Sequence, residues 1–299
     1  MIGKRQKNTQ DLISSRKNII FAEEITNIKV MNFFRRILKP FVPILAAIYG
    51  FSLIYVTAIP IADGNFTLGR EALSWMLTLA AIGLTCIITY WLEPKVFPES
   101  KQLSMKLPKL TVIAGLLLLA PLWLVVEGYL VYGLTSLIHS VRLESITYTP
   151  DELSEDLLAG VHAVLLAPVL EELCFRQLAI SPFRQRKSKI IVCAVMALFF
   201  GILHVRNFIG ASIGAMLFGL VFIWTRNIWY AIILHMGRNL TITLVAIYCM
   251  LGLGEIRMSS TPVIYLFDAK VVFATVVMAV IGFIMLKKTF QHRSVNLEP

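Results

Sequence analysis

Eight apolar runs, each long enough to cross a bilayer as a helix, constrain this chain more than any other feature of its sequence. A membrane-spanning helix needs about 20 predominantly apolar residues. Runs of about this length cover residues 41–61, 73–91, 110–132, 157–179, 190–207, 209–225, 228–251 and 270–286. The sequence therefore predicts an all-α, polytopic membrane protein with about eight transmembrane helices. Seven spans remain an alternative, because only Arg206 and Asn207 separate the fifth run from the sixth.

The composition excludes most soluble classes. Hydrophobic residues make up 57% of the chain, charged residues 15%, and the mean hydropathy is +0.75. Water-soluble domains carry about 25% charged residues, so an ordinary cytosolic, collagen-like or disordered protein is excluded. The four cysteines lie inside apolar runs with no Cys-x-x-Cys pairing. Neither a disulfide framework nor a zinc knuckle is therefore indicated.

The distribution of Lys and Arg predicts how the chain is oriented. The two terminal segments and the even-numbered loops hold 21 Lys and Arg residues, whereas the odd-numbered loops hold five. The positive-inside rule then places both termini in the cytoplasm. Together with the apolar runs, this orientation divides the chain into a basic cytoplasmic arm at 1–40, a transmembrane domain at 41–286 and a cytoplasmic tail at 287–299.

The formal net charge of +10 is explained by this topology. Basic residues between membrane spans suit the anionic headgroups of membrane lipids. A nucleic-acid partner would require a basic face on a folded soluble module, which the sequence does not contain. We therefore expect membrane lipid, and no nucleic acid, among the partners.

Polar side chains recur inside three spans of the second half. The fourth span contains Glu171, Glu172 and Arg176, the fifth ends with Phe200 and His204, and the seventh contains His235 and Asn239. Ionisable groups at membrane depth are costly and usually face a protein interior or a wet cavity. A carboxylate, two imidazoles and an amide that converge there can activate water and hold an oxyanion, as amide hydrolysis requires.

The two neighbouring acids are expected to have different roles. Glu172 and Arg176 are four residues apart and can form a structural ion pair on one helical face. Glu171 points about 100° away on the helix, toward a different neighbour, and is left free for chemistry. Pro168 removes a backbone hydrogen bond just upstream and can bend the helix.

The depths of these residues in the bilayer are predicted to differ. By the rise per residue of an α-helix, Glu171, His204 and His235 lie about 15, 22 and 10 Å from the cytoplasmic ends of their helices. Tilt or a kink at Pro168 is needed to bring them together. Outside the three motifs, Arg238 is expected to pair with Glu172 or reach the headgroups, and Glu127 to snorkel toward the outer boundary.

Three motifs in this order resemble a known family. Glu-Glu-x-x-x-Arg (Glu171, Glu172, Arg176), Phe-x-x-x-His (Phe200, His204) and His-x-x-x-Asn (His235, Asn239) are similar to those of the CAAX-processing and bacteriocin-processing family, also called the Abi family, of intramembrane endopeptidases. The resemblance covers about residues 160–245 and implies a catalytic core at about 157–251.

The resemblance implies a role for each motif residue. Glu171 would be the general base that activates the attacking water, assisted by His204. His235 and Asn239 would stabilise the oxyanion, while Glu172, Arg176 and Phe200 would support the site. The substrate would be a membrane-associated peptide or protein, in bacteriocin processing, signal-peptide processing or self-immunity. A bacterial plasma membrane is the expected location, with the endoplasmic reticulum left open.

The sequence leaves the need for a metal open, since the family has been described both with and without one. If the activity is metal-dependent, Glu171, His204 and His235 could supply a zinc site with an open position. The sequence lacks a His-Glu-x-x-His helix, so it does not predict a zincin.

Three other functions remain as alternatives. Gly210–Gly214 matches Gly-x-Ser-x-Gly, so Ser212 with His235 could form a rhomboid-like serine–histidine pair, although small residues at this spacing are more typical of helix packing. A non-catalytic membrane immunity or scaffold protein, binding a peptide or a sensor partner, is a second alternative. A transporter is the third, but no pair of broken helices repeats between the two halves.

Overall fold

The computed structural model describes residues 31–32, 35–58, 68–98, 106–138, 140–145, 160–253, 256–260 and 263–295. Most of the predicted arm at 1–40 therefore lies outside the described residues. Its last part is helical from Arg35 to Leu38 and continues in a short 3-10 helix, η1 (Lys39–Phe41).

A helical segment overlaps each of the eight predicted spans. The helices are α2 (Val42–Ala58), α3 (Leu68–Ile87) with the π-helix η3 (Ile88–Leu92), α4 (Glu93–Val96), α5 (Leu110–Ser136), α7 (Ala167–Glu172) with the π-helix η5 (Leu173–Leu178), α8 (Arg186–Leu203), the 3-10 helix η6 (Val205–Asn207), α9 (Phe208–Thr225), α10 (Ile228–Met250) and α11 (Ala269–Val295). The prediction of an all-α polytopic membrane fold is confirmed. The helix α11 continues beyond residue 286, where the span was predicted to end.

Six described helices are long and apolar enough to cross a membrane. The segment at 160–178 and α8 are not among these six. The first is interrupted by a turn at Leu166, and α8 opens with Arg186, Lys187 and Lys189. The count of eight spans and the side on which the termini lie stay predictions.

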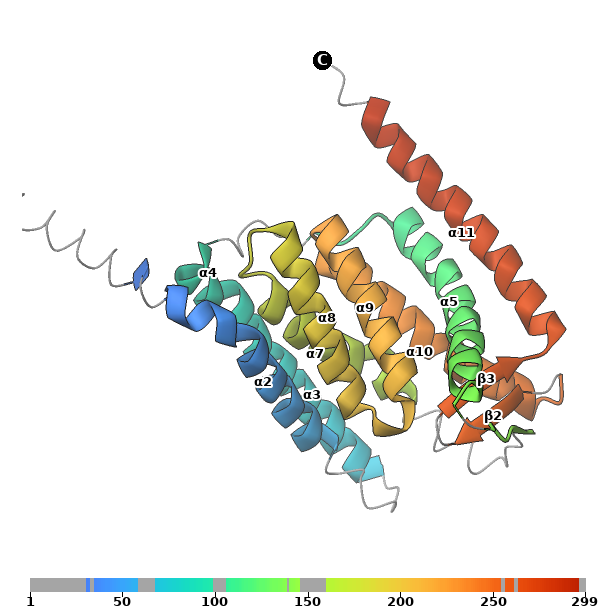
Figure 1. Cartoon of the computed structure of the whole chain (residues 1–299). Coiled ribbons are helices and arrows are strands. Elements are labelled where there is room, and N and C mark those ends of the chain that lie inside the picture. Colours follow the sequence, from blue (N-terminus) through green and yellow to red (C-terminus); the bar gives the residue numbers. More distant parts are fainter. Residues whose placement is uncertain are drawn as a thin grey trace, which may run out of the picture.

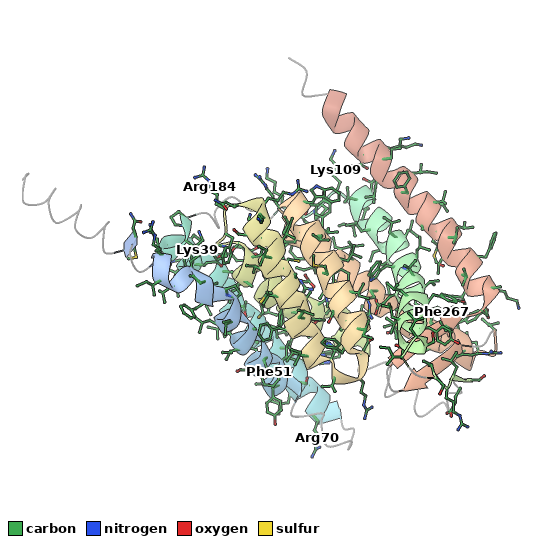
Figure 2. All side chains as sticks on the ribbon, viewed as in Figure 1. Lys39, Phe51, Arg70, Lys109, Arg184 and Phe267 are labelled. Carbon is green, nitrogen blue, oxygen red and sulfur yellow. The ribbon has the colours of Figure 1, made fainter. Side chains whose placement is uncertain are left out.

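The helices form a bundle with the motif-bearing elements at its centre (Figure 1). The pair α2 and α3 packs on one side of α7 and α8, and α5 packs on the other side against α10 and α11. Basic residues mark one end of the bundle, where Lys39, Lys109 and Arg184 lie, whereas Arg70 and Phe267 lie toward the other end (Figure 2).

A small antiparallel sheet, which the sequence did not predict, lies beside α5. Its order is β1 (Glu144–Ser145), β2 (Ile256–Ser260), β3 (Val263–Phe267), with Met258 paired to Tyr265. The hydroxyl of Tyr129 on α5 donates to the carbonyl of Phe267 over 3.1 Å. Strands this short depend on such tertiary contacts more than on their own propensity.

The fifth and sixth predicted spans, which only two residues separate in the sequence, are two distinct helices with a turn of the chain between them. Helix α8 ends at Leu203, and His204 has φ −102° and ψ 56°. The two helices then pack closely through small residues. A Cβ placed on Gly201 would lie 2.7 Å from the carbonyl oxygen of Phe208 and would also collide with the hydroxyl of Ser212.

This close approach predicts that Gly201→Ala destabilises the protein by about 1 to 3 kcal/mol, the usual cost of overpacking. The Phe208 carbonyl belongs to the backbone and cannot rotate away. The matched control is Gly133→Ala on α5, because nothing lies within 4 Å of a Cβ at Gly133. Unfolding of the purified protein in mixed micelles measures both. Equal stability of the two variants would contradict the predicted close contact.

Candidate active site

The acidic motif lies on a helix that is broken upstream of it. The helical segment from Gly160 turns at Leu166, which has φ −97° and ψ −47°, and α7 begins at Ala167 with Pro168 in its first turn. The interruption near Pro168 agrees with the expectation that this residue bends the helix. Glu171 and Glu172 then end α7, and Arg176 lies on the π-helix η5.

Glu172 joins two motifs through one oxygen. Its Oε1 lies 3.2 Å from an Arg176 guanidinium nitrogen and 2.9 Å from Nδ1 of His235. The Glu172 and Arg176 side chains are 0% and 3% exposed, so the predicted ion pair is present and buried. A second guanidinium nitrogen of Arg176 donates to the Ala215 carbonyl over 3.1 Å.

Glu171 does not point to a different neighbour, as its position on the helix predicted. Its Oε2 lies 3.6 Å from Nε2 of His235, whose Nδ1 contacts Glu172. One imidazole reaches both acids because its two nitrogens lie on different edges of the ring. The angular separation of the two carboxylates on the helix is therefore spanned by a single side chain from α10.

Aromatic stacking connects Arg176 to both histidines. Phe200 stacks on His204 with ring centroids 4.4 Å apart, and Phe218 stacks on His235 at 4.9 Å. The Arg176 guanidinium lies 5.2 Å from the Phe200 ring centroid and 6.0 Å from that of Phe218. These distances are within the range of cation–π attraction. Phe218 belongs to none of the three motifs and could not be singled out from the sequence.

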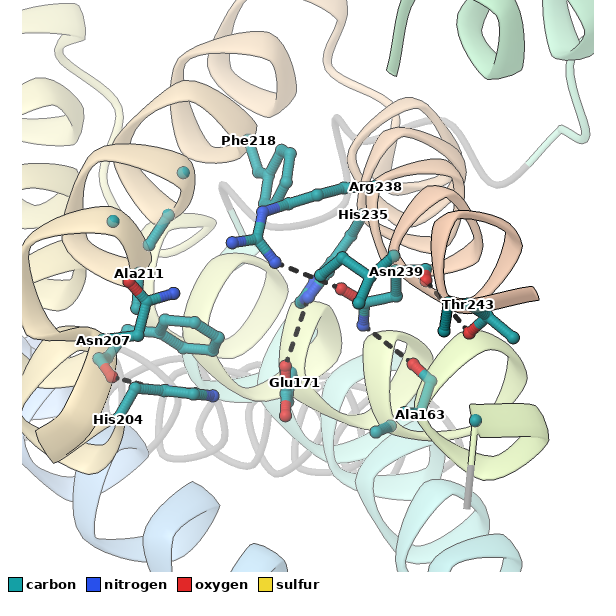
Figure 3. A pocket seen from close by; sticks show the side chains of 18 residues that line it. Ala163, Glu171, His204, Asn207, Ala211, Phe218, His235, Arg238, Asn239 and Thr243 are labelled. Carbon is teal, nitrogen blue, oxygen red and sulfur yellow. Dashed lines mark hydrogen bonds and ion pairs between the residues drawn. The ribbon is translucent and has the colours of Figure 1, made fainter. Parts of the chain in front are cut away.

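The four predicted catalytic residues border one cavity of about 420 Å³. Figure 3 shows Glu171, His235 and Asn239 close together, with His204 across from them. Phe200 also borders this cavity, whereas Glu172 and Arg176 do not. The unequal depths predicted for the three ionisable groups are thus reconciled, since α8 ends just before His204 and the Glu171 helix is interrupted at Leu166.

The hydrogen bond of His204 fixes which nitrogen faces the cavity. Its Nδ1 lies 2.8 Å from the Phe200 carbonyl oxygen. A carbonyl only accepts, so Nδ1 must carry the proton, and in the neutral ring Nε2 is then an acceptor. The ring is turned toward Glu171 (Figure 3). His204 therefore presents a lone pair to whatever occupies the space between them.

Asn239 is oriented from two sides. Its amide nitrogen donates to the Ala163 carbonyl over 2.8 Å, and its Oδ1 accepts from an Arg238 guanidinium nitrogen at 3.4 Å. Together these contacts assign the amide nitrogen and oxygen. The amide group has two N–H bonds and Ala163 accepts one of them, so the other is available to a ligand.

A second buried ion pair corrects two expectations. Nε of Arg238 lies 2.9 Å from Oε2 of Glu127, and a terminal nitrogen lies 2.5 Å from Oε1. Arg238 therefore pairs with neither Glu172 nor the headgroups, and Glu127 does not snorkel. Gly210 leaves room for the pair, because a Cβ there would lie 2.6 Å from Oε1 of Glu127. The sequence showed only that two different spans carry opposite charges, not that these charges pair.

Comparison with known families bears on this site directly. Residues 153–241 match the family model described as type II CAAX prenyl endopeptidase Rce1-like. All three motifs lie inside the matched segment. The resemblance recognised from the motifs is thereby confirmed over less than a third of the chain, and the match supports a CAAX-type intramembrane protease. No curated protein and no solved structure gives a significant match to the chain.

The conditional zinc site is not formed by the Rce1-like segment in this structure. Glu171 and His235 are in contact, but His204 lies across the cavity from them (Figure 3). Within the described ranges, no three His, Cys, Asp or Glu side chains are grouped to hold one metal ion. In this arrangement, Glu171, His204 and His235 do not fit a single metal ion.

The serine alternative also finds no support in the geometry. Ser212 lies at the α8–α9 contact against Gly201 and does not border the cavity. His235, in contrast, borders the cavity and contacts Glu171 and Glu172. Gly210 and Gly214 border the cavity instead, whereas Gly219 provides a close approach to α8, because a Cβ there would collide with Sγ of Cys193.

Glu171 and Glu172 are predicted to contribute differently to the stability of the protein. Glu172→Gln should cost about 3 kcal/mol of stability, because Arg176 would remain as a buried charge without its carboxylate. Glu171→Gln should cost about 1 kcal/mol, because this side chain borders a cavity. Unfolding in mixed micelles compares the two variants. A larger loss for Glu171→Gln would contradict the structural role of Glu172.

The Glu127–Arg238 pair predicts strong coupling between α5 and α10. Glu127→Gln and Arg238→Met should each destabilise the protein by about 3 kcal/mol, because each leaves a buried charge unpaired. The double variant should lose less than the sum of the two, with a coupling energy of about 1 to 3 kcal/mol. A double-mutant cycle in mixed micelles measures this energy, and strict additivity would exclude a direct pair.

Proposed function

We propose that this protein is an intramembrane endopeptidase that hydrolyses a peptide bond of a membrane-associated peptide or protein. The observation that carries the proposal is the difference between its two adjacent carboxylates. Glu172 is neutralised by Arg176 and lies away from the cavity, whereas Glu171 borders it. Glu171 is therefore the carboxylate that can accept a proton from water.

The space between Glu171 and His204 suits the attacking water. Glu171 accepts one proton of this water, and Nε2 of His204 accepts a hydrogen bond from the other. Two acceptors on opposite sides orient the oxygen lone pair toward a carbonyl carbon placed in the cavity. The stacking of His204 on Phe200 holds the imidazole in this position.

The side of the cavity that carries Glu171 also supplies donors for the oxyanion. Asn239 offers its second amide N–H, and His235 offers Nε2 when that nitrogen carries a proton. Fixed donors in a site that excludes bulk water stabilise developing negative charge at no cost of reorganisation. Glu172 and Ala163 orient these two side chains before a substrate arrives.

The proton balance closes within these residues. The water oxygen forms a bond to the carbonyl carbon while Glu171 takes the water proton. The carbon–nitrogen bond then breaks, and Glu171 returns the proton to the leaving amine. As part of this proposal, the substrate is a bacteriocin or a signal peptide, or the cleavage serves self-immunity. The protein would act in a bacterial plasma membrane.

The proposal predicts that Glu171→Gln abolishes specific peptide cleavage while the protein remains in the membrane. Cells producing the wild-type protein, Glu171→Gln or the matched control Glu144→Gln at equal levels are compared by mass spectrometry of membrane-associated and released peptides. Glu144 is exposed and pairs with Arg142 at the surface. Cleavage products present with the wild type and the control, and absent with Glu171→Gln, are expected.

Identical peptide profiles in all three strains would contradict the peptidase proposal. If deletion of the whole protein still gave a phenotype, a non-catalytic immunity or scaffold function, in which a peptide or sensor partner is bound, would take its place. Prenylated and unprenylated products are distinguished in the same spectra by the mass of the lipid group.

A further inference from the structure

A second cavity lies at the basic end of the bundle, separate from the active site. Its volume is about 540 Å³ and four cationic side chains border it: Arg35, Arg36, Lys39 and Arg184. Asn32, Phe97 and Pro98 complete the lining that is described, and this lining includes no carboxylate. No residue is shared with the cavity that contains Glu171.

The cations come from segments far apart in the sequence. Three lie on the segment leading into α2, and Arg184 lies between η5 and α8. Figure 2 shows Lys39 and Arg184 at the same end of the bundle. Like charges repel, so a fold that gathers them around one cavity is favoured by an anion that binds between them.

Part of this cavity is already organised for a ligand. The guanidinium of Arg35 donates to Oδ1 of Asn32 over 3.1 Å and to the Lys95 carbonyl over 3.3 Å. Arg36 and Arg184 are exposed, and no interaction with another described residue holds them. A guanidinium group binds a phosphate through two parallel N–H bonds, which makes Arg the preferred partner of this anion.

The surroundings of the cavity indicate a lipid rather than a soluble phosphate. Ile37, Leu38 and Phe41 extend exposed apolar side chains beside it. The exposed Trp91 carries the Lys95 ammonium 3.5 Å from its ring centroid. Exposed aromatic and basic side chains at the same level are typical of the headgroup region of a bilayer. Acyl chains could lie along the apolar side chains while the headgroup enters the cavity.

We propose that this cavity binds the phosphate of an anionic phospholipid. Basic pockets at the cytoplasmic side of membrane proteins bind phospholipid headgroups in this way. Bound lipid would bridge the segment leading into α2 and the loop before α8. The proposal does not depend on the peptidase activity, because it concerns residues and a cavity outside the active site.

Native mass spectrometry of the purified full-length protein in detergent tests the proposal. The protein is titrated with phosphatidylglycerol, with phosphatidylcholine and with glycerol 3-phosphate. Phosphatidylglycerol should bind at least tenfold more tightly than either of the others, since it combines an anionic headgroup with acyl chains. The double variant Arg36→Gln/Arg184→Gln should lose about tenfold of this affinity.

Two further variants make the result specific. Lys287→Gln/Lys288→Gln removes the same charge from exposed positions on α11 and should bind phosphatidylglycerol like the wild type. Arg36→Lys/Arg184→Lys keeps the charge but loses the parallel N–H bonds, so it should recover part of the affinity, which excludes misfolding as the cause of the loss. Unchanged binding by the Gln double variant would overturn the proposed site. Glycerol 3-phosphate binding as tightly as the lipid would overturn the choice of ligand.

Discussion

The rest of the site depends on the buried ion pair between Glu172 and Arg176. The Glu172 carboxylate contacts Arg176 on the adjoining η5 and His235 on α10 through the same oxygen. A charge this deeply buried is tolerated only with a partner, so the two helices cannot separate without a large electrostatic cost. Arg176 then lies against Phe200 and Phe218, the rings that stack on His204 and His235. One ion pair thereby positions two imidazoles from different helices.

The second ion pair extends this arrangement beyond the Rce1-like segment. Glu127 lies on α5, outside residues 153–241, and it binds Arg238, which in turn contacts Asn239. The orientation of a proposed oxyanion donor thus depends on a helix that carries none of the three motifs. Glu171 belongs to neither of these two ion pairs and is the carboxylate in the described lining of the cavity, which is why the proposed mechanism gives it the water proton.

Much of this could be predicted from the sequence because the relevant signals are local. The apolar runs indicated the helices, and the four-residue spacing of Glu172 and Arg176 indicated their ion pair. The partner of Arg238 could not be predicted, because Glu127 is 111 residues away in the sequence. Which carboxylate binds Arg238 depends on how the helices pack. The sheet was missed for a similar reason, since its short strands depend on contacts with each other and with α5.

The position of His204 shows where helical periodicity reaches its limit. Counted as part of a continuous helix, it lay too far from the other groups. The end of α8 at Leu203 and the following corner place it at the cavity, and the main-chain bond to Phe200 fixes its ring. Such an end depends on the tight α8–α9 contact at Gly201, which a single sequence does not reveal.

A structure of the wild-type protein in lipid nanodiscs, at a resolution that shows ordered water, tests the central claim most directly. The account predicts a water molecule within about 3 Å of both a Glu171 carboxylate oxygen and Nε2 of His204, the distance that general-base catalysis requires. A His204 ring turned away from the cavity, or protein atoms filling the space between these two side chains, would contradict it.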